Sequence, residues 1–234
     1  MLPELERHHE VLAPTLLGHA DGPPLGGEVN SAVIADAVER AMDDAGFETV
    51  HIVGNSLGGY VSLQLAARGR AESVVAFAPA GGWAKGDRAP AELLSFQSML
   101  QAQLKAAAPF ADAIVASPGG RRQATQLITT NFEHIPGDLI AHQIRGAASC
   151  TGAAAMIKFA MLDDWNLEAE KITCPVRIVW GTDDKLLPWP SAASRYLHEW
   201  LPNADWVELE GVGHCPQLDV PVEAAQLVTG FTAG

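Results

Sequence analysis

A serine set between two glycines is the first feature of this 234-residue chain that could carry out chemistry. Ser56 lies in Gly54-Asn55-Ser56-Leu57-Gly58, directly after an apolar run that ends at Val53 and before an apolar stretch of helical character. The glycines permit a sharp turn that lifts the serine side chain out of the strand top. A serine hydroxyl is a weak nucleophile at neutral pH, so it needs a base, an acid that orients the base, and donors for an oxyanion.

Two later loops offer the base and the acid. His214 lies in Gly211-Val212-Gly213-His214-Cys215-Pro216 and is the best-placed general base among the eight histidines. Asp184 follows an apolar run at 176–180, and open α/β sheets place catalytic groups at the C-terminal ends of their strands. Asp183 is its rival, because one of the two carboxylates could cap the turn instead. The N–H of Leu57 could hold an oxyanion, since it opens a helix.

The elements that must position these residues alternate between strands and helices. Apolar runs predict strands at 9–14, 50–53, 73–78, 176–180 and 206–209, and helical spacing predicts helices at 30–46, 57–69, 191–200 and 221–231. Parallel strands cannot be joined by tight hairpins, so crossover helices must connect them. The sequence therefore predicts an α/β fold with a mostly parallel sheet and helices on both faces.

The middle of the chain departs from this alternation. Segments 90–108, 121–130, 138–148 and 151–162 have helical character, and no convincing strand lies among them. We therefore expect residues 1–81 and 171–234 to form two parts of one core and residues 82–170 to form a helical insertion.

The combined pattern resembles the α/β-hydrolase superfamily over nearly the whole chain. The order Ser56, Asp184, His214 agrees with that family, as do Gly181-x-x-Asp184-x-x-x-Pro188 and Gly213-His214. The resemblance implies that Ser56 attacks a carbonyl carbon, that His214 takes and returns the proton, and that Asp184 rather than Asp183 orients His214. It also implies that the Leu57 N–H holds the oxyanion and that the insertion is a lid over the pocket. The many apolar residues of this lid favour an apolar acyl or alcohol group.

The N-terminal segment departs from the family pattern. Members usually open with two or three strands and a His-Gly loop that supplies a second oxyanion donor, and then reach a segment similar to Val11–His19. Here that segment already lies at the N-terminus, so about 25 residues of the pattern are absent. The absence would leave the strand ending at Val53 without a neighbour and would remove an oxyanion donor worth about 3 to 4 kcal/mol. We expect an upstream extension to raise soluble yield and esterase rate.

Several functions fit this pattern, and hydrolysis of a small, largely apolar carboxylic ester through an acyl-enzyme on Ser56 fits best. Asn55 also precedes the serine in hydrolases that cleave carbon–carbon bonds of ring-cleavage products, so that reaction is an alternative. Cys215 weakens it, because that subgroup typically has tryptophan after the histidine. Dehalogenases and epoxide hydrolases of the fold carry aspartate at the position of Ser56, which argues against both. A non-catalytic ligand-binding or truncated inactive member is the third alternative.

Composition limits the partners. With 28 acidic and 15 basic residues the net charge is −13, which would repel nucleic acid and anionic membranes. The first ten residues contain Glu4, Glu6 and Glu10 where a signal peptide has an apolar core. The three cysteines form no C-x-x-C pair, so neither disulfides nor a thiolate metal site is predicted, and a reducing cytoplasm fits. We expect a small-molecule substrate without a metal or cofactor, and the sequence leaves a homodimer open.

Overall fold

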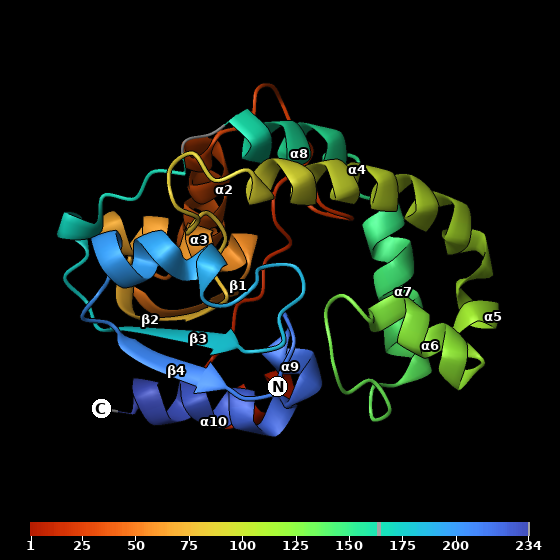
Figure 1. Cartoon of the computed structure of the whole chain (residues 1–234). Coiled ribbons are helices and arrows are strands. Elements are labelled where there is room, and N and C mark those ends of the chain that lie inside the picture. The colour runs from red at the N-terminus through yellow and green to blue at the C-terminus, as the bar shows by residue number, and fades with distance from the viewer. Residues whose placement is uncertain (163–164, 234) are drawn as a thin grey trace.

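The architecture is a parallel sheet with helices on both faces, together with a lobe of helices (Figure 1). The computed structural model describes residues 1–162 and 165–233, apart from the side chains of Pro90 and Leu94. Residues 163–164, which belong to the predicted insertion, and Gly234 lie outside the described residues. The sheet has the order β1-β2-β3-β4, with β1 (Val50–Asn55), β2 (Ala71–Phe77), β3 (Val176–Gly181) and β4 (Asp205–Leu209) all parallel. The predicted α/β class is confirmed.

The central strands are buried on both faces. Val74 and Ala76 of β2 belong to the large core cluster that includes side chains of α2 (Ser31–Asp44) and α3 (Leu57–Ala67). The alternate residues Val75 and Phe77 pack on the other face against α10 (Pro221–Thr232) and the short helix α1 (Leu2–Leu5). Strands covered on both faces read as continuous apolar runs, and this is why the sequence reveals them.

The insertion consists mainly of helices and has a small core of its own. The helices are α4 (Ala89–Ala107), α5 (Ala111–Val115), α6 (Pro118–Thr125), α7 (Gly137–Ala148) and α8 (Ala153–Leu162). Ala111 and Val115 of α5 pack against Ile140 and Ile144 of α7. Figure 1 shows α5, α6 and α7 standing to one side of the sheet, while α4 and α8 reach back over α3.

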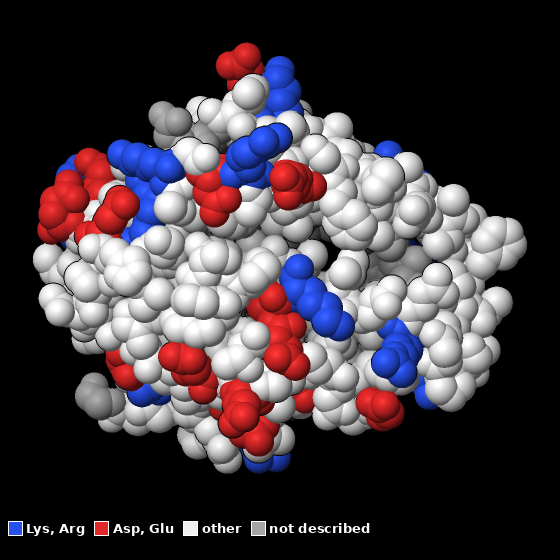
Figure 2. Space-filling model, in the orientation of Figure 1, with Lys and Arg blue, Asp and Glu red and all other residues white. Residues whose placement is uncertain are grey.

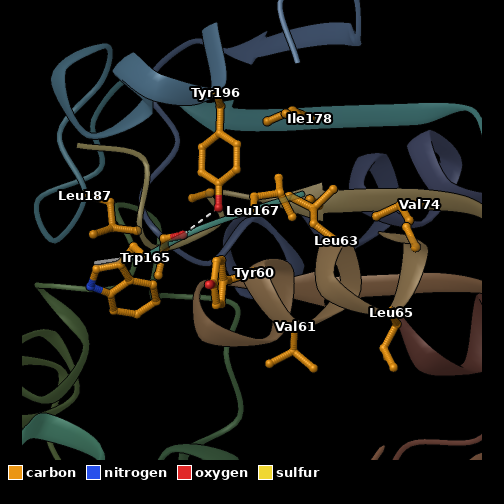
Figure 3. Packing of buried hydrophobic residues seen from close by; sticks show 14 of the residues in the cluster. Tyr60, Val61, Leu63, Leu65, Val74, Trp165, Leu167, Ile178, Leu187 and Tyr196 are labelled. Carbon is orange, nitrogen blue, oxygen red and sulfur yellow. Dashed lines mark hydrogen bonds between the residues drawn. The ribbon is translucent and has the colours of Figure 1, made fainter. Parts of the chain in front are cut away.

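Trp165 joins the insertion to the core. Its ring meets Tyr60 of α3 edge to face at 4.9 Å between centroids and lies 5.6 Å from the ring of Phe159 of α8. The Tyr60 hydroxyl donates to the carbonyl of Asn166 at 2.7 Å. Figure 3 shows Tyr60 and Trp165 beside the fully buried Tyr196, whose hydroxyl donates to the Ala80 carbonyl at 2.6 Å. Aromatic packing of this kind fixes the return of the chain from the insertion to β3.

One predicted strand is wrong. Residues 9–14 form no strand, because a groove separates them from the open edge of β1 and leaves their backbone without a ladder of hydrogen bonds. The predicted helix at 191–200 is helical throughout but irregular. Ser191–Ala193 form a 3₁₀ turn and Tyr196–Trp200 a π turn, and the Arg195 N–H between them donates to the carbonyl of Gly82 at 2.7 Å.

The outer edge of β1 is open. Within the described residues β1 pairs only with β2. Val50 and Ser56 donate their N–H groups toward β2, so the alternation of a parallel strand turns the backbone groups of His51, Val53 and Asn55 outward. A largely apolar groove of about 650 Å³ runs along this edge, between β1 and residues 9–14. The expected loss of a neighbour for this strand therefore agrees with the structure.

None of the helices in residues 1–162 and 165–233 combines the length and the apolar character needed to cross a bilayer.

Candidate functional site

Ser56 occupies a strained turn between β1 and α3. Its φ of 56° and ψ of −119° lie where a residue with a side chain rarely sits. Three hydrogen bonds hold the turn. The Ser56 N–H donates to Phe77 O at 2.9 Å, and Ser56 O accepts from the N–H groups of Tyr60 and Ala80 at 3.1 and 3.0 Å. The arrangement holds the side chain at the C-terminal end of the sheet, as a nucleophile requires.

Close packing requires only one of the two glycines that flank this turn. A Cβ on Gly54 would lie 2.2 Å from the Gly58 carbonyl oxygen and 2.4 Å from Ser62 Oγ. A Cβ on Gly58 would meet nothing within 4 Å. Packing around the turn thus demands a missing side chain at Gly54 and leaves room for one at Gly58.

Asp184 and His214 form a buried pair. Asp184 Oδ2 lies 2.7 Å from His214 Nδ1, and each residue is 4% exposed. Asp184 Oδ1 accepts the N–H groups of Leu186 and Leu187 at 2.9 and 2.8 Å. The side chain of the rival Asp183 is exposed, and its N–H donates to Val212 O at 3.0 Å. The structure therefore places Asp184, and not Asp183, where it can orient an imidazole.

Gly181 lets the end of β3 approach the His214 loop. A Cβ at this position would lie 2.2 Å from the carbonyl oxygen of Val212 and 2.5 Å from that of Gly213. Only a residue without a side chain fits such a close approach of two backbones. Gly181 therefore determines how closely the end of β3 approaches the loop that carries His214.

The Asn55 side chain links the serine turn to the His214 loop. Its Nδ2 donates to His214 O at 2.9 Å and to Phe77 O at 3.1 Å, and its Oδ1 accepts from Gln217 Nε2 at 3.1 Å. Among the described residues no hydrogen bond joins Ser56 Oγ to the imidazole of His214. Such a bond often forms or shortens only when substrate binds.

Cys215 is a buried thiol beside this site. Desolvation, followed by the charges of Asp184 and Asp219, raises the pKa of Cys215 to about 12. A thiol with such a pKa stays protonated at neutral pH and is a poor nucleophile. Cys215 therefore fills space beside His214.

Leu57, the predicted oxyanion donor, is the first residue of α3. The first N–H groups of a helix have no acceptor within the helix, and the helix dipole favours negative charge there. Its role in the site stays a prediction.

Comparison with known proteins agrees with this geometry. Residues 1–227 match the model of the alpha/beta hydrolase family. The chain belongs to that family. It is 34% identical over 204 residues to the epoxide hydrolase EphH of Mycobacterium tuberculosis, covering 87% of this chain and 95% of that protein. The putative carbamate hydrolase RutD of Stutzerimonas stutzeri is 26% identical over 217 residues, with 91% and 77% covered.

A solved structure supports the fold. The 2-hydroxy-6-oxo-6-phenylhexa-2,4-dienoate hydrolase BphD of Rhodococcus sp. strain RHA1 superposes with a TM-score of 0.72 at 21% identity, covering 100% of this chain and 83% of that one. At this identity the similarity shows the fold alone. The family match and the relative at 34% identity establish a hydrolase of the α/β-hydrolase type.

Proposed function

We propose that this protein is a serine hydrolase that cleaves a small, largely apolar carboxylic ester through an acyl-enzyme on Ser56. The observation that carries the proposal is the buried 2.7 Å pair of Asp184 and His214, which Asn55 ties to the strained turn at Ser56. A buried carboxylate beside one imidazole nitrogen favours the tautomer in which the other nitrogen can accept a proton.

The reaction consists of two acyl transfers. His214 Nε2 takes the proton of Ser56 Oγ as the oxygen attacks the ester carbonyl, and the Leu57 N–H stabilises the oxyanion. The bond from the carbonyl carbon to the alcohol oxygen breaks, and the alcohol leaves with the proton from His214. Water then gives a proton to His214 and attacks the acyl-enzyme, which releases the acid and restores Ser56.

Support for an apolar substrate comes from the insertion. The surface is hollowed below α4, beside α7 (Figure 2), and the charged groups on this face are scattered. Phe96 and Met99 of α4 are 39% and 59% exposed. An apolar acyl or alcohol group would bury part of such surface on binding.

Epoxide opening is the second candidate, because a relative at 34% identity is named an epoxide hydrolase. Attack of Ser56 on an epoxide carbon would form an ether. An ether has no carbonyl carbon for water to attack and no oxyanion to stabilise, so turnover would stop after one event. The serine at this position therefore favours acyl transfer.

Carbon–carbon cleavage is favoured less. The sequence feature that suggested it, Asn55, uses its amide to hold the Phe77 and His214 carbonyls and the Gln217 side chain. Because the Asn55 amide already has these partners, it holds the His214 loop in place rather than binding the substrate.

The test is hydrolysis of p-nitrophenyl butyrate by the wild type, by Ser56→Ala and by the control Ser95→Ala, whose serine lies on the exposed side of α4. Turnover by the wild type and the control, and loss in Ser56→Ala, supports the proposal. Equal turnover in all three refutes the assignment of Ser56. A carbamate, an epoxide and a ring-cleavage dienoate complete the panel, and turnover of one of these in place of the ester would replace the proposed substrate. Absence of turnover with every compound favours a ligand-binding member.

A further inference from the structure

Asp219 is a buried carboxylate that the proposed reaction does not use. It ends the short helix α9 (Pro216–Asp219) and is 2% exposed. Its Oδ1 accepts the backbone N–H groups of Thr130 and Asn131, each at 2.8 Å, and its Oδ2 accepts the N–H of Gly213 at 2.6 Å. No ion pair within the described residues includes Asp219, so backbone N–H groups surround its charge.

The three donors come from two distant parts of the chain. Thr130 and Asn131 lie in the connection between α6 and α7 of the insertion, whereas Gly213 directly precedes His214. Two further bonds join the same segments, since the Cys215 N–H donates to Ile128 O at 2.9 Å and the Thr130 hydroxyl donates to Gly211 O at 2.7 Å. The residues on both sides of His214 are thus tied to one piece of the insertion, residues 128–131.

A buried carboxylate of this kind strongly fixes the relative positions of the backbone donors that surround it. A buried charge is costly unless hydrogen bonds satisfy it, and bonds to a carboxylate are short and directional. A movement of Gly213 or of residues 128–131 would leave part of the charge without a donor. Because Gly213 is covalently bound to His214, the same movement would also disturb the 2.7 Å contact with Asp184.

We propose that Asp219 is a positioning residue that locks the His214 loop to residues 128–131, so that the insertion and the imidazole keep one relative placement. The inference rests on the proposed function, because that function makes His214 the base. Asp219 itself touches no reacting atom and acts through Gly213.

Asp219→Asn tests this placement. The substitution keeps the shape of the side chain. It replaces one of the carboxylate oxygens, which accept backbone N–H groups, with an NH₂ group, which can only donate. The control is Glu210→Gln, which removes an exposed carboxylate four residues before His214. Two readouts are compared: the low-field proton resonance of the bond between His214 Nδ1 and Asp184, and kcat and KM for p-nitrophenyl butyrate.

We expect the resonance to shift or disappear in Asp219→Asn and to stay in place in Glu210→Gln. We also expect kcat to fall about 100-fold, since a displacement of about 1 Å can have that effect, while KM changes less than about threefold. A purely structural role would lower the unfolding midpoint but leave the resonance and kcat of the folded protein unchanged. An unchanged resonance in folded Asp219→Asn overturns the proposal, whatever the rate.

Thr130→Val provides a second test if Asp219→Asn does not fold. It removes the hydroxyl contacts to Gly211 and to Asp219, the latter at 3.3 Å, and leaves the carboxylate in place. A shifted resonance with a severalfold lower kcat supports the lock, and an unchanged resonance overturns it. The resonance does not depend on the substrate, so a wild type without esterase activity would refute the proposed function while this readout still decides the role of Asp219.

Discussion

The His214 loop (residues 211–216) and the outer edge of β1 lie on opposite sides of Ser56. Several elements hold the loop by hydrogen bonds, whereas no strand within the described residues pairs with the edge. Hydrogen bonds from β1, α9 and the insertion reach the loop, and Asp184 and His214 are almost fully buried. Along the outer edge of β1 the backbone groups of His51, Val53 and Asn55 face a groove of about 650 Å³. The Asp184–His214 pair is thus organised by the closed side of the sheet, while the strand that leads to Ser56 has, within the described residues, a neighbouring strand on one side only.

The largest expected effect is on the closed side. Asp184→Asn should lower kcat about 10⁴-fold, because an NH₂ group facing His214 Nδ1 favours the wrong tautomer. The neighbouring Asp183→Asn removes an exposed carboxylate and should change kcat less than about twofold. Steady-state ester hydrolysis measures both. A larger loss in Asp183→Asn would reverse the assignment of the acid.

The next effect concerns the packing of the His214 loop. Gly181→Ala places a Cβ 2.2 Å from Val212 O and should cost about 3 kcal/mol of unfolding free energy, with a loss of kcat as the loop moves. Gly26→Ala, in the N-terminal segment where a Cβ meets nothing within 4 Å, should stay within about 0.5 kcal/mol. Urea unfolding gives the two values. Similar losses would contradict the idea that packing is tighter around the loop.

A matched pair of isoleucines compares the strands directly. Ile178 of β3 is fully buried, so Ile178→Ala should cost about 3 to 4 kcal/mol. Ile52 of β1 is half-buried beside the open edge, and Ile52→Ala should cost about 1 to 2 kcal/mol. Unfolding curves at fixed pH provide the comparison. Equal costs would mean that the open edge does not weaken packing on β1.

The smallest effect is a dependence on pH. The thiol of Cys215 has a pKa raised from 9.0 to about 12, mainly by desolvation. Between these values the unfolded chain releases its proton first and binds fewer protons than the folded chain, so stability falls as pH rises above about 9. The free energy of unfolding should fall more steeply in the wild type than in Cys215→Ala, by up to about 1 kcal/mol per pH unit. Parallel slopes from denaturation at pH 8, 9 and 10 would exclude this contribution.

The sequence predicts the sheet and most of its helices because their apolar residues have clear periods. The four strands and the helices α2, α3 and α10 agree with the prediction to within a few residues. The strand expected at 9–14 is wrong because its formation depends on a neighbour and not on its own residues. The change of helix type near Arg195 likewise involves a contact with Gly82, more than 100 positions away.

The residues of the candidate site likewise differ in whether the sequence alone can reveal them. Ser56, Asp184 and His214 stand out because their motifs are local. The roles of Asn55 and Asp219 depend on contacts with partners 88 to 162 positions distant, which no local pattern reveals. Asp219 had one weak signal, an acid between Leu218 and Val220 in an apolar stretch.

The bond between Asn55 and His214 closes a loop of 159 positions. On the ribosome β1 and β2 emerge before β3, and β2 has no second neighbour until β3 has been synthesised. During that interval the edge of β2 that later receives β3 is uncovered, and uncovered strand edges readily associate with other chains. The pairing of β2 with β3 therefore waits for the whole insertion to be synthesised, and the contact of Asn55 with the His214 loop can form only after that pairing.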